Sequence, residues 1–271
     1  MLALIAGTGD LPPAVLQALP TRPLVCALAG FAPKVTPDIT FRIERLGGFL
    51  RDLCTRGVTQ ICMVGAIRRP PVRLQSLDLA TLTLVPTIWR ALRRGDDGAL
   101  RAFIAVLERR GFTVLGAHEV APALLPPVGV LTQVQPQDRH RIDAVVGEGH
   151  LVGMGAADLG QACIVRDGHV VDAEDDSGTD ALLLRHQTIQ DDRIAASDRT
   201  GGILFKGPKP QQDRRADLPV VGVGTVMNAA AAGLAGLVIE ADGVMVPDRT
   251  GVIETLDALG MFLWVRPKGA I

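Results

Sequence analysis

The chain begins MLALIAGTGDLP (residues 1–12), a short apolar run that ends in a glycine-rich turn. A run of this length followed by a turn is typical of a buried strand. Three further apolar runs of strand length lie at residues 24–30, 60–67 and 112–120. Helix-length stretches separate the later runs, as at Leu46–Gly57. Strands that alternate with helices predict an α/β fold with a parallel sheet and helices on its faces.

The character of the sequence changes after residue 120. The stretch APALLPPVGVLTQVQPQ is rich in proline and has no charged residue, which favours an extended connection. The alternation of helices and strands restarts at Asp138 and continues toward the C-terminus. We therefore expect an N-terminal domain over residues 1–121, a linker over 122–137 and a distinct C-terminal α/β domain over 138–271.

Charge is distributed unevenly along the chain. The formal net charge is −1, but residues 1–136 hold 15 Lys and Arg against 9 Asp and Glu, while the remainder holds 13 against 20. Positive charge in the first half is typical of a surface that binds phosphates, a partner or anionic lipid, although the same charges could simply solvate helices. Aromatic residues make up 3% of the chain and tyrosine is absent. A base-stacking surface is therefore not expected, which argues against a nucleic-acid partner.

Cysteine usage and hydropathy indicate a cytoplasmic protein. Four cysteines are scattered without the spacing of a metal site, and such thiols stay reduced in the cytosol. Residues 1–6 are predicted as a strand, so we do not expect a signal peptide. The uncharged stretch Leu218–Ile239 divides into VVGVGTV, AAAAGLAG and the start of LVIEA. These pieces fit a strand, a helix and a strand better than one membrane-spanning helix.

The glycine-rich turn after the first strand is a candidate phosphate site. Gly7 and Gly9 let backbone N–H groups approach a phosphate near the start of the next helix. A dinucleotide fingerprint would have a third glycine where Pro12 stands, and an acidic residue where the second strand ends at Ala29-Gly30. An NAD-dependent oxidoreductase is therefore disfavoured, while a phosphoryl ligand and a plain tight turn remain open.

Two pairs of polar residues in the first part of the chain have both structural and functional interpretations. Asp96 and Asp97, in RRGDDGAL, could cap a helix or face a site. His118 and Glu119 follow a predicted strand at the edge where parallel sheets bind ligands, and strand alternation would direct them to opposite faces. This pair lacks the HExxH spacing of a zinc site.

The acidic stretch EDDSGTD occupies residues 174–180. Thr179 and Asp180 stand at the start of a predicted helix, where they could cap it or hold a phosphate together with a divalent cation. The spacing excludes an EF-hand calcium loop.

A basic loop stiffened by prolines, LFKGPKPQQDRRADLPVVG, occupies residues 204–222. Lys206 and Lys209 suit a phosphate group, and Gln212 adds an uncharged donor. Asp217 follows near the end of the loop, and its carboxylate can hold a metal ion or orient water. These residues favour phosphoryl chemistry, with a salt-bridged surface loop as the alternative.

Taken in order, these motifs and their neighbours resemble one family over essentially the whole chain. The matching stretches are AGTGDLP, RRGDDGALRA, GAHEV, DLGQACIV, GTDALLLR, FKGPKPQQDRRADLPVVGVGT and AAGLAGLVIEA. They resemble the LpxI-type UDP-2,3-diacylglucosamine pyrophosphatases. The resemblance implies a Rossmann-like N-terminal domain and a C-terminal α/β catalytic domain, with the glycolipid held between them. It also implies a step of lipid A synthesis in Gram-negative bacteria: water attacks the α-phosphate of UDP-2,3-diacylglucosamine, with a divalent cation, usually Mg²⁺. The products are UMP and 2,3-diacylglucosamine 1-phosphate.

The resemblance also implies the site residues. The family's catalytic aspartate lies in an R-x-D-L-P motif, which corresponds to Asp217 here. We expect Lys206 and Lys209 to act with it, and Asp180 or Asp97 to share a metal ion with it. The substrate contacts that we expect are Gly7, Gly9, Asp96, His118, Glu119, Gln161, Thr179 and Gln212.

Two positions depart from the family pattern. Ser177 stands where a glutamate is common, and Ala66 stands where an asparagine is common. They keep a second function class open, namely a non-catalytic nucleotide- or glycolipid-binding protein on the same scaffold. For the enzyme we expect a cytoplasmic protein that is peripheral on the inner membrane, because its basic N-terminal part suits an anionic leaflet. We also expect a homodimer.

Overall fold

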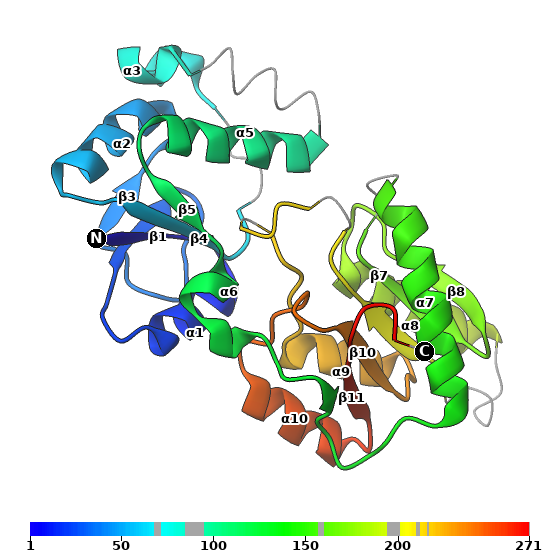
Figure 1. Ribbon diagram of the computed structural model, residues 1–271. Coiled ribbons are helices and arrows are strands. Elements are labelled where there is room, and N and C mark those ends of the chain that lie inside the picture. Colours follow the sequence, from blue (N-terminus) through cyan, green and yellow to red (C-terminus); the bar gives the residue numbers. More distant parts are fainter. Residues whose placement is uncertain are drawn as a thin grey trace. The chain divides into compact units, whose positions relative to one another are not determined.

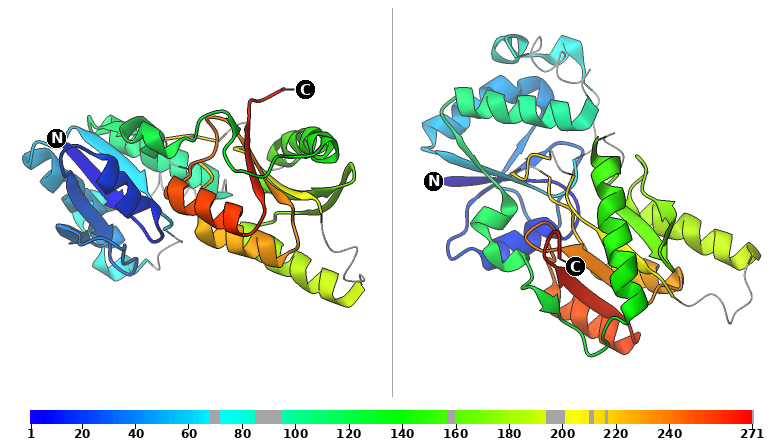
Figure 2. Two further views of the ribbon diagram at one scale, coloured as in Figure 1. Left: turned by 90° about the horizontal axis from the view of Figure 1, so that it is seen from below. Right: turned by 45° about the vertical axis from the view of Figure 1, so that its right-hand side comes forward.

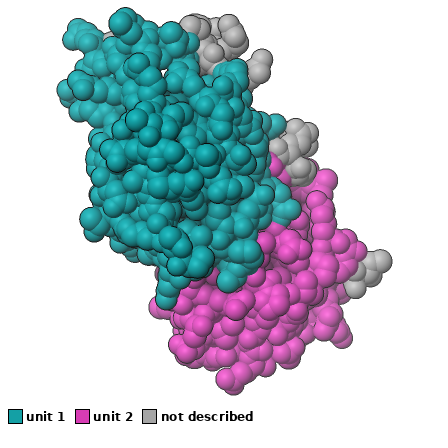
Figure 3. Space-filling model, turned by 60° about the vertical axis from the view of Figure 1, so that its left-hand side comes forward, with its two compact units in different colours: residues 1–124, 213–217 teal, residues 125–212, 218–271 magenta. Residues whose placement is uncertain are grey.

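The chain divides into two compact units, which Figure 3 colours separately. Unit 1 contains Met1–Leu124 and Asp213–Asp217, and unit 2 contains Leu125–Gln212 and Leu218–Ile271. The short segment Asp213–Asp217 thus belongs with the N-terminal unit, although it lies within the range expected for the C-terminal domain. The computed structural model describes residues 1–67, 72–84, 95–156, 160–193, 201–209, 212–215 and 217–270.

Unit 1 is built on a five-stranded parallel sheet in the order β3-β2-β1-β4-β5. Its strands are β1 (Leu2–Ala6), β2 (Leu24–Leu28), β3 (Ile39–Phe41), β4 (Gln60–Val64) and β5 (Thr113–Leu115). The helices described in it are α1 (Leu11–Ala18), α2 (Leu46–Thr55), α3 (Leu79–Leu82), α5 (Gly95–Arg109) and α6 (Ala117–Val120). The predicted parallel, Rossmann-like sheet is therefore confirmed. The strand order reverses between β1 and β4, where open sheets of this kind bind ligands beyond their carboxyl ends.

Helices cover both faces of this first sheet. Figures 1 and 2 show α2 and α5 on one side and α1 on the other. Leu46, Leu50 and Leu53 recur every three or four residues along α2, which places them on one helix face. These three leucines are fully buried in a cluster with Leu107 of α5 and Ile61 of β4. This apolar face fixes α2 and α5 against the sheet and leaves the carboxyl ends of the strands to the loops.

Unit 2 has a six-stranded mixed sheet in the order β6-β11-β10-β9-β7-β8. Its strands are β6 (Gly129–Val130), β7 (Ala162–Arg166), β8 (His169–Ala173), β9 (Ile203–Lys206), β10 (Gly236–Glu240) and β11 (Phe262–Arg266). The central strands β9, β10 and β11 are parallel, while β6, β7 and β8 pair in the antiparallel sense. The helices described in it are α7 (Asp138–Ala156), α8 (Thr179–Arg193), α9 (Val223–Ala231) and α10 (Arg249–Ala258).

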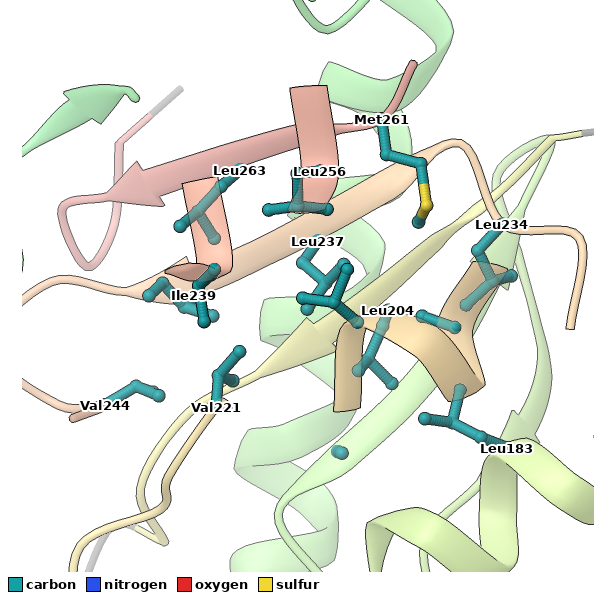
Figure 4. Packing of buried hydrophobic residues seen from close by; sticks show 14 of the residues in the cluster. Leu183, Leu204, Val221, Leu234, Leu237, Ile239, Val244, Leu256, Met261 and Leu263 are labelled. Atoms are coloured by element: carbon teal, nitrogen blue, oxygen red, sulfur yellow. The ribbon is translucent and has the colours of Figure 1, made fainter. Parts of the chain in front are cut away.

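Two hydrophobic clusters pack against the second sheet. One joins buried residues of α8, α9 and α10 to the central strands, and Figure 4 shows Leu204, Leu237, Ile239, Leu256 and Leu263 within it. The other joins α7 to alternate residues of the same strands, such as Phe205 and Val238. Because successive strand residues point to opposite faces, both faces of the central strands are apolar and covered by helices.

The predicted linker contains secondary structure of its own. A 3₁₀ turn at Pro122–Leu124 lies in unit 1. The strand β6 follows in unit 2, where it pairs with β11 at the edge of the sheet. The segment therefore contributes to both units.

The stretch VVGVGTV does not form the predicted strand. Val220 makes only an isolated bridge with Met245, and α9 begins at Val223 after an extended Gly222. The place in the sheet beside β10 is held by β9, so the apolar residues of this stretch are buried by the helix instead. Among the described residues, no helix combines the length and apolar character needed to cross a bilayer.

Candidate active site

The glycine turn after β1 is bonded to the loop after β4. The Gly7 N–H donates to the carbonyl of Val64 at 2.8 Å, and Thr8 and Ala66 exchange two backbone hydrogen bonds of 2.9 and 3.0 Å. A Cβ on Gly7 would lie 2.6 Å from the Ala66 carbonyl oxygen, so only glycine permits this approach. Gly9 has a φ of 99°, a backbone conformation that glycine adopts without steric cost and other residues rarely adopt. The amides of Gly7 and Thr8 are thus used within the fold rather than offered to a phosphate.

The same geometry bears on the family departure at Ala66. This residue bonds Thr8 through its backbone N–H and carbonyl groups, which every residue except proline supplies. Its side chain plays no part in those bonds. The loop–loop contact therefore does not need the asparagine that is common at this position.

His118 and Glu119 do not continue the strand, contrary to the alternation expected for them. Residues 117–120 form the helical turn α6, because the Glu119 carboxylate accepts a hydrogen bond from the Gly116 N–H at 2.6 Å and caps that turn. His118 is half-buried, and burial lowers its pKa below the usual value. Its Nδ1 atom is buried without a hydrogen-bond partner in the described part of the chain. Glu119 is consequently a capping residue, and His118 stays the better candidate for a ligand contact.

The end of β5 also adjoins the segment that carries Asp217. A Cβ on Gly116 would meet the His118 ring at 2.6 Å and the Arg214 carbonyl oxygen at 3.2 Å. Gly116 therefore lets the chain at Arg214 pass close to the carboxyl end of the first sheet. This is the edge at which ligands bind in open parallel sheets.

Asp217 lies at the end of a tightly bonded turn. Its N–H donates to the carbonyl of Asp213 at 3.3 Å, and its side chain is exposed. The Arg215 guanidinium donates to both carboxylate oxygens of Asp213, at 2.9 and 2.7 Å, and to Glu108 of α5 at 2.6 Å. Ala216 lies outside the described residues. The turn that ends at the exposed residue Asp217 is thus anchored on α5.

Lys206, which we expect to act with Asp217, is buried in unit 2. Its side chain is 5% exposed, and its ammonium donates to the Thr179 hydroxyl at 2.8 Å and to the Val220 carbonyl at 3.0 Å. The Thr179 hydroxyl donates in turn to the Glu174 carboxylate at 2.6 Å. Thr179 therefore links a buried cation to a buried anion.

The other site residues expected in unit 2 differ in how many hydrogen bonds they make within the fold. The Asp180 carboxylate is exposed and accepts a hydrogen bond from Asn228 at 3.1 Å. The Gln212 side-chain oxygen accepts from the Lys209 N–H at 3.2 Å, so Gln212 folds back on its own loop. The Gln161 carbonyl accepts from the Gly207 N–H at 3.2 Å, while its side-chain oxygen is buried without a hydrogen-bond partner among the described residues.

Ser177, the second departure from the family pattern, completes the turn before α8. Its N–H donates to the Asp175 carboxylate at 2.9 Å, and its hydroxyl makes a short hydrogen bond to the same oxygen. Arg185 of α8 also donates to Asp175 at 3.2 Å. The serine is therefore accounted for by the local turn.

The expected metal ligands lie on separate elements. Asp217 belongs to unit 1 and Asp180 to unit 2. Asp96 and Asp97 fall in the first turn of α5, and their side chains lie outside the described residues. Within the described part of the chain, no three His, Cys, Asp or Glu side chains gather as a preformed metal site. Mg²⁺ at phosphate sites needs only one or two carboxylates, with phosphate oxygens and water completing its shell, so the exposed Asp217 carboxylate fits that requirement.

Sequence reasoning missed the partners that hold these side chains. Glu108 gave no signal, because it is 107 residues from Arg215 and lies in an ordinary helical pattern. Glu174 was visible only as one of several acids in EDDSGTD. The spacing Asp213-x-Arg215 could have indicated a local Asx-type turn, since Asp side chains commonly bond the backbone two residues on.

Comparison with known proteins assigns both units to one family. Residues 1–124 match the LpxI N-terminal domain and residues 127–264 match the LpxI C-terminal domain. The boundary between the two matches lies beside Leu124, as the first boundary between the units does, whereas Asp213–Asp217 falls within the C-terminal match and within unit 1. A curated protein of Caulobacter vibrioides, UDP-2,3-diacylglucosamine pyrophosphatase LpxI, is 36% identical over 268 residues, covering 97% of this chain and 96% of that protein. The chain therefore belongs to the LpxI family.

Proposed function

We propose that this chain is a hydrolase that converts UDP-2,3-diacylglucosamine to UMP and 2,3-diacylglucosamine 1-phosphate in lipid A synthesis. The observation that carries the proposal is the match to a pyrophosphatase of that name over 97% of the chain. The exposed Asp217 carboxylate, in the R-x-D-L-P motif, supports it. In the reaction, a water oxygen bonds to one phosphorus of the diphosphate and the bond from that phosphorus to the bridging oxygen breaks. The bridging oxygen leaves with the other phosphate, so that the products are UMP and the sugar 1-phosphate.

Asp217 and the two lysines of the loop would have different roles in the reaction. Asp217 would hold a divalent cation or orient the attacking water, and it is the one that we assign to catalysis. Bound Mg²⁺ would supply positive charge that offsets the developing charge on the diphosphate. Lys209 is half-buried in the loop after β9 and could contact the same phosphates. Lys206 would act by ordering that loop, because its ammonium is bonded to Thr179 and Val220.

An assay of UMP release tests the proposal directly. Purified protein would be mixed with Mg²⁺ and the UDP-glycolipid, with Asp217→Ala and Asp217→Asn in parallel. We expect release by the wild type, loss of about a hundredfold or more in both variants, and loss with EDTA that Mg²⁺ reverses. Wild-type protein that binds the glycolipid without releasing UMP would support the non-catalytic alternative. Retained activity in both variants would overturn the catalytic role of Asp217 but not the proposed function.

We further propose that the protein associates peripherally with an anionic membrane. Residues 1–124 hold 15 Lys and Arg against 9 Asp and Glu, and the substrate carries two acyl chains. Val72, Leu79 and Leu82 of unit 1 are exposed apolar side chains that could enter the lipid interface. Cosedimentation with phosphatidylglycerol vesicles should exceed that with phosphatidylcholine vesicles, and it should fall as salt rises. Equal binding to both would contradict the electrostatic contribution.

The expected homodimer stays a prediction. Light scattering on the eluted protein at several concentrations would give its molar mass, against 28.6 kDa for one chain.

A further inference from the structure

The segment that carries Asp217 is held by three charged side chains of unit 1. Arg215 lies between Asp213, two residues before it in the chain, and Glu108, near the end of α5. Its Nε and Nη2 atoms donate to the two oxygens of the Asp213 carboxylate at 2.9 and 2.7 Å. Its Nη1 atom donates to Glu108 at 2.6 Å. One guanidinium thus joins the segment to a helix more than a hundred residues away in sequence.

The same segment is also closed on itself. One Asp213 carboxylate oxygen accepts the backbone N–H of Arg215 at 3.1 Å, which is the geometry of an Asx turn. The Asp213 carbonyl accepts the N–H of Asp217 at 3.3 Å. Fixing Asp213 and Arg215 on α5 therefore fixes the turn that ends at Asp217.

These contacts suit orientation better than stabilisation of the whole fold. The Arg215 side chain is 36% exposed, Glu108 46% and Asp213 17%. Ion pairs this close to solvent contribute little to the free energy of folding. Two parallel N–H···O bonds from a planar guanidinium do restrict direction, because both must align at once. Lysine, a point charge, would keep the attraction and lose that alignment.

We infer that Glu108, Arg215 and Asp213 form a clamp that positions Asp217 for the reaction. The inference rests on the proposed function, since it assigns Asp217 to catalysis. Arg215 and Glu108 are positioning residues, which act through Asp217 and are given no contact with the substrate. Displacing a reacting group by about 1 Å can cost on the order of a hundredfold in rate, so loss of the clamp should act on kcat.

The first measurement compares kcat and KM for Glu108→Ala, Arg215→Lys and the double variant. Alanine at position 108 keeps α5 helical, because alanine has the highest helix propensity. We expect kcat to fall by about tenfold to a hundredfold in each single variant, with KM nearly unchanged. The double variant should be no slower than Arg215→Lys, since Glu108 acts only through Arg215. In an Asp217→Ala background, Glu108→Ala should leave the residual rate unchanged.

The matched control is Asp52→Ala. Asp52 pairs with Arg56 at 2.8 Å on α2, and both side chains are about half exposed, so it is an equivalent surface ion pair in the same unit. It should leave kcat unchanged. If Glu108→Ala or Arg215→Lys behaves like this control, the clamp is overturned.

The second measurement does not depend on activity. Hydrogen–deuterium exchange of peptides that cover residues 213–217 should speed up in Glu108→Ala and Arg215→Lys, and not in Asp52→Ala. Wild-type protein without UMP release would overturn the proposed function, and with it any positioning role for these residues. Unchanged exchange would overturn the clamp itself. Faster exchange with unchanged kcat would show a structural contact with no positioning role, and so would also overturn the inference.

Discussion

The ammonium of Lys206 donates a hydrogen bond to the hydroxyl of Thr179 across 2.8 Å. Lys206 ends β9 and Thr179 begins α8, so the bond joins two elements of unit 2. The Thr179 hydroxyl donates its own hydrogen bond to the carboxylate of Glu174, a residue that is 8% exposed. Buried charges are costly unless they are paired or hydrogen-bonded, and here one hydroxyl serves both.

Removing that hydroxyl should destabilise unit 2. Thr179→Val preserves shape but leaves Lys206 and Glu174 each short of a partner. We expect a loss of about 1–3 kcal/mol in the free energy of unfolding, measured by urea denaturation. Thr179→Ser keeps the hydroxyl and should lose less. If the valine and serine variants were equally stable, the hydroxyl would not be bridging these charges.

Lys206 and Lys209 should differ in their effect on stability. Lys206→Met would leave the Thr179 hydroxyl and the Val220 carbonyl without the ammonium that donates to them, and should cost about 3 kcal/mol. Lys209 is only half-buried, and Lys209→Met should cost less than about 1 kcal/mol. Thermal unfolding of both variants checks this order. The reverse order would contradict a structural role for the buried Lys206 ammonium.

Two glycines of α7 should respond oppositely to alanine. A Cβ on Gly149 meets no atom within 4 Å, so Gly149→Ala should stabilise the protein by about 0.5–1 kcal/mol through helix propensity. A Cβ on Gly147 would lie 2.7 Å from that of Phe205, so Gly147→Ala should destabilise by about 1–3 kcal/mol. Urea unfolding of the two variants gives both values. A stabilising Gly147→Ala would contradict the packing of α7 on β9.

The four cysteines should fall into two classes of reactivity. Cys54 is exposed, whereas burial raises the pKa of Cys26, Cys62 and Cys163 to about 12. Since the thiolate is the reactive form, native protein at pH 8 should show one fast thiol with an aromatic disulfide reagent, and four after denaturation. Cys54→Ser should abolish the fast phase. A second fast thiol in the native protein would show that one of the buried positions opens.

The repeated pattern of apolar runs and helical stretches was sufficient to predict most elements of the two sheets. The periodicity of apolar residues indicates which face of a strand or helix is buried, and it can be read within a short window of sequence. The predicted strand at VVGVGTV was wrong, because its apolar residues are equally compatible with burial by a helix, and β9 already holds the place in the sheet. Short apolar runs are ambiguous in this way.

The candidate site was predicted less completely. The sequence indicated Asp217 through its motif, and Lys206 through its charge. The presence of a lysine in the sequence does not show whether its ammonium is exposed to solvent or hydrogen-bonded inside the fold. The strand alternation predicted for Glu119 was wrong, since its capping bond to Gly116 depends on where β5 ends.

By itself the sequence determined the α/β class, the two-part organisation and the family, because these depend on local periodicity and on the order of motifs. Only the tertiary structure decided that Asp213–Asp217 belongs with the N-terminal unit and that Glu108 meets Arg215 across 107 residues. Such pairings are set by how the elements pack. The sequence around Glu108 and the sequence around Arg215 do not predict that the two side chains meet.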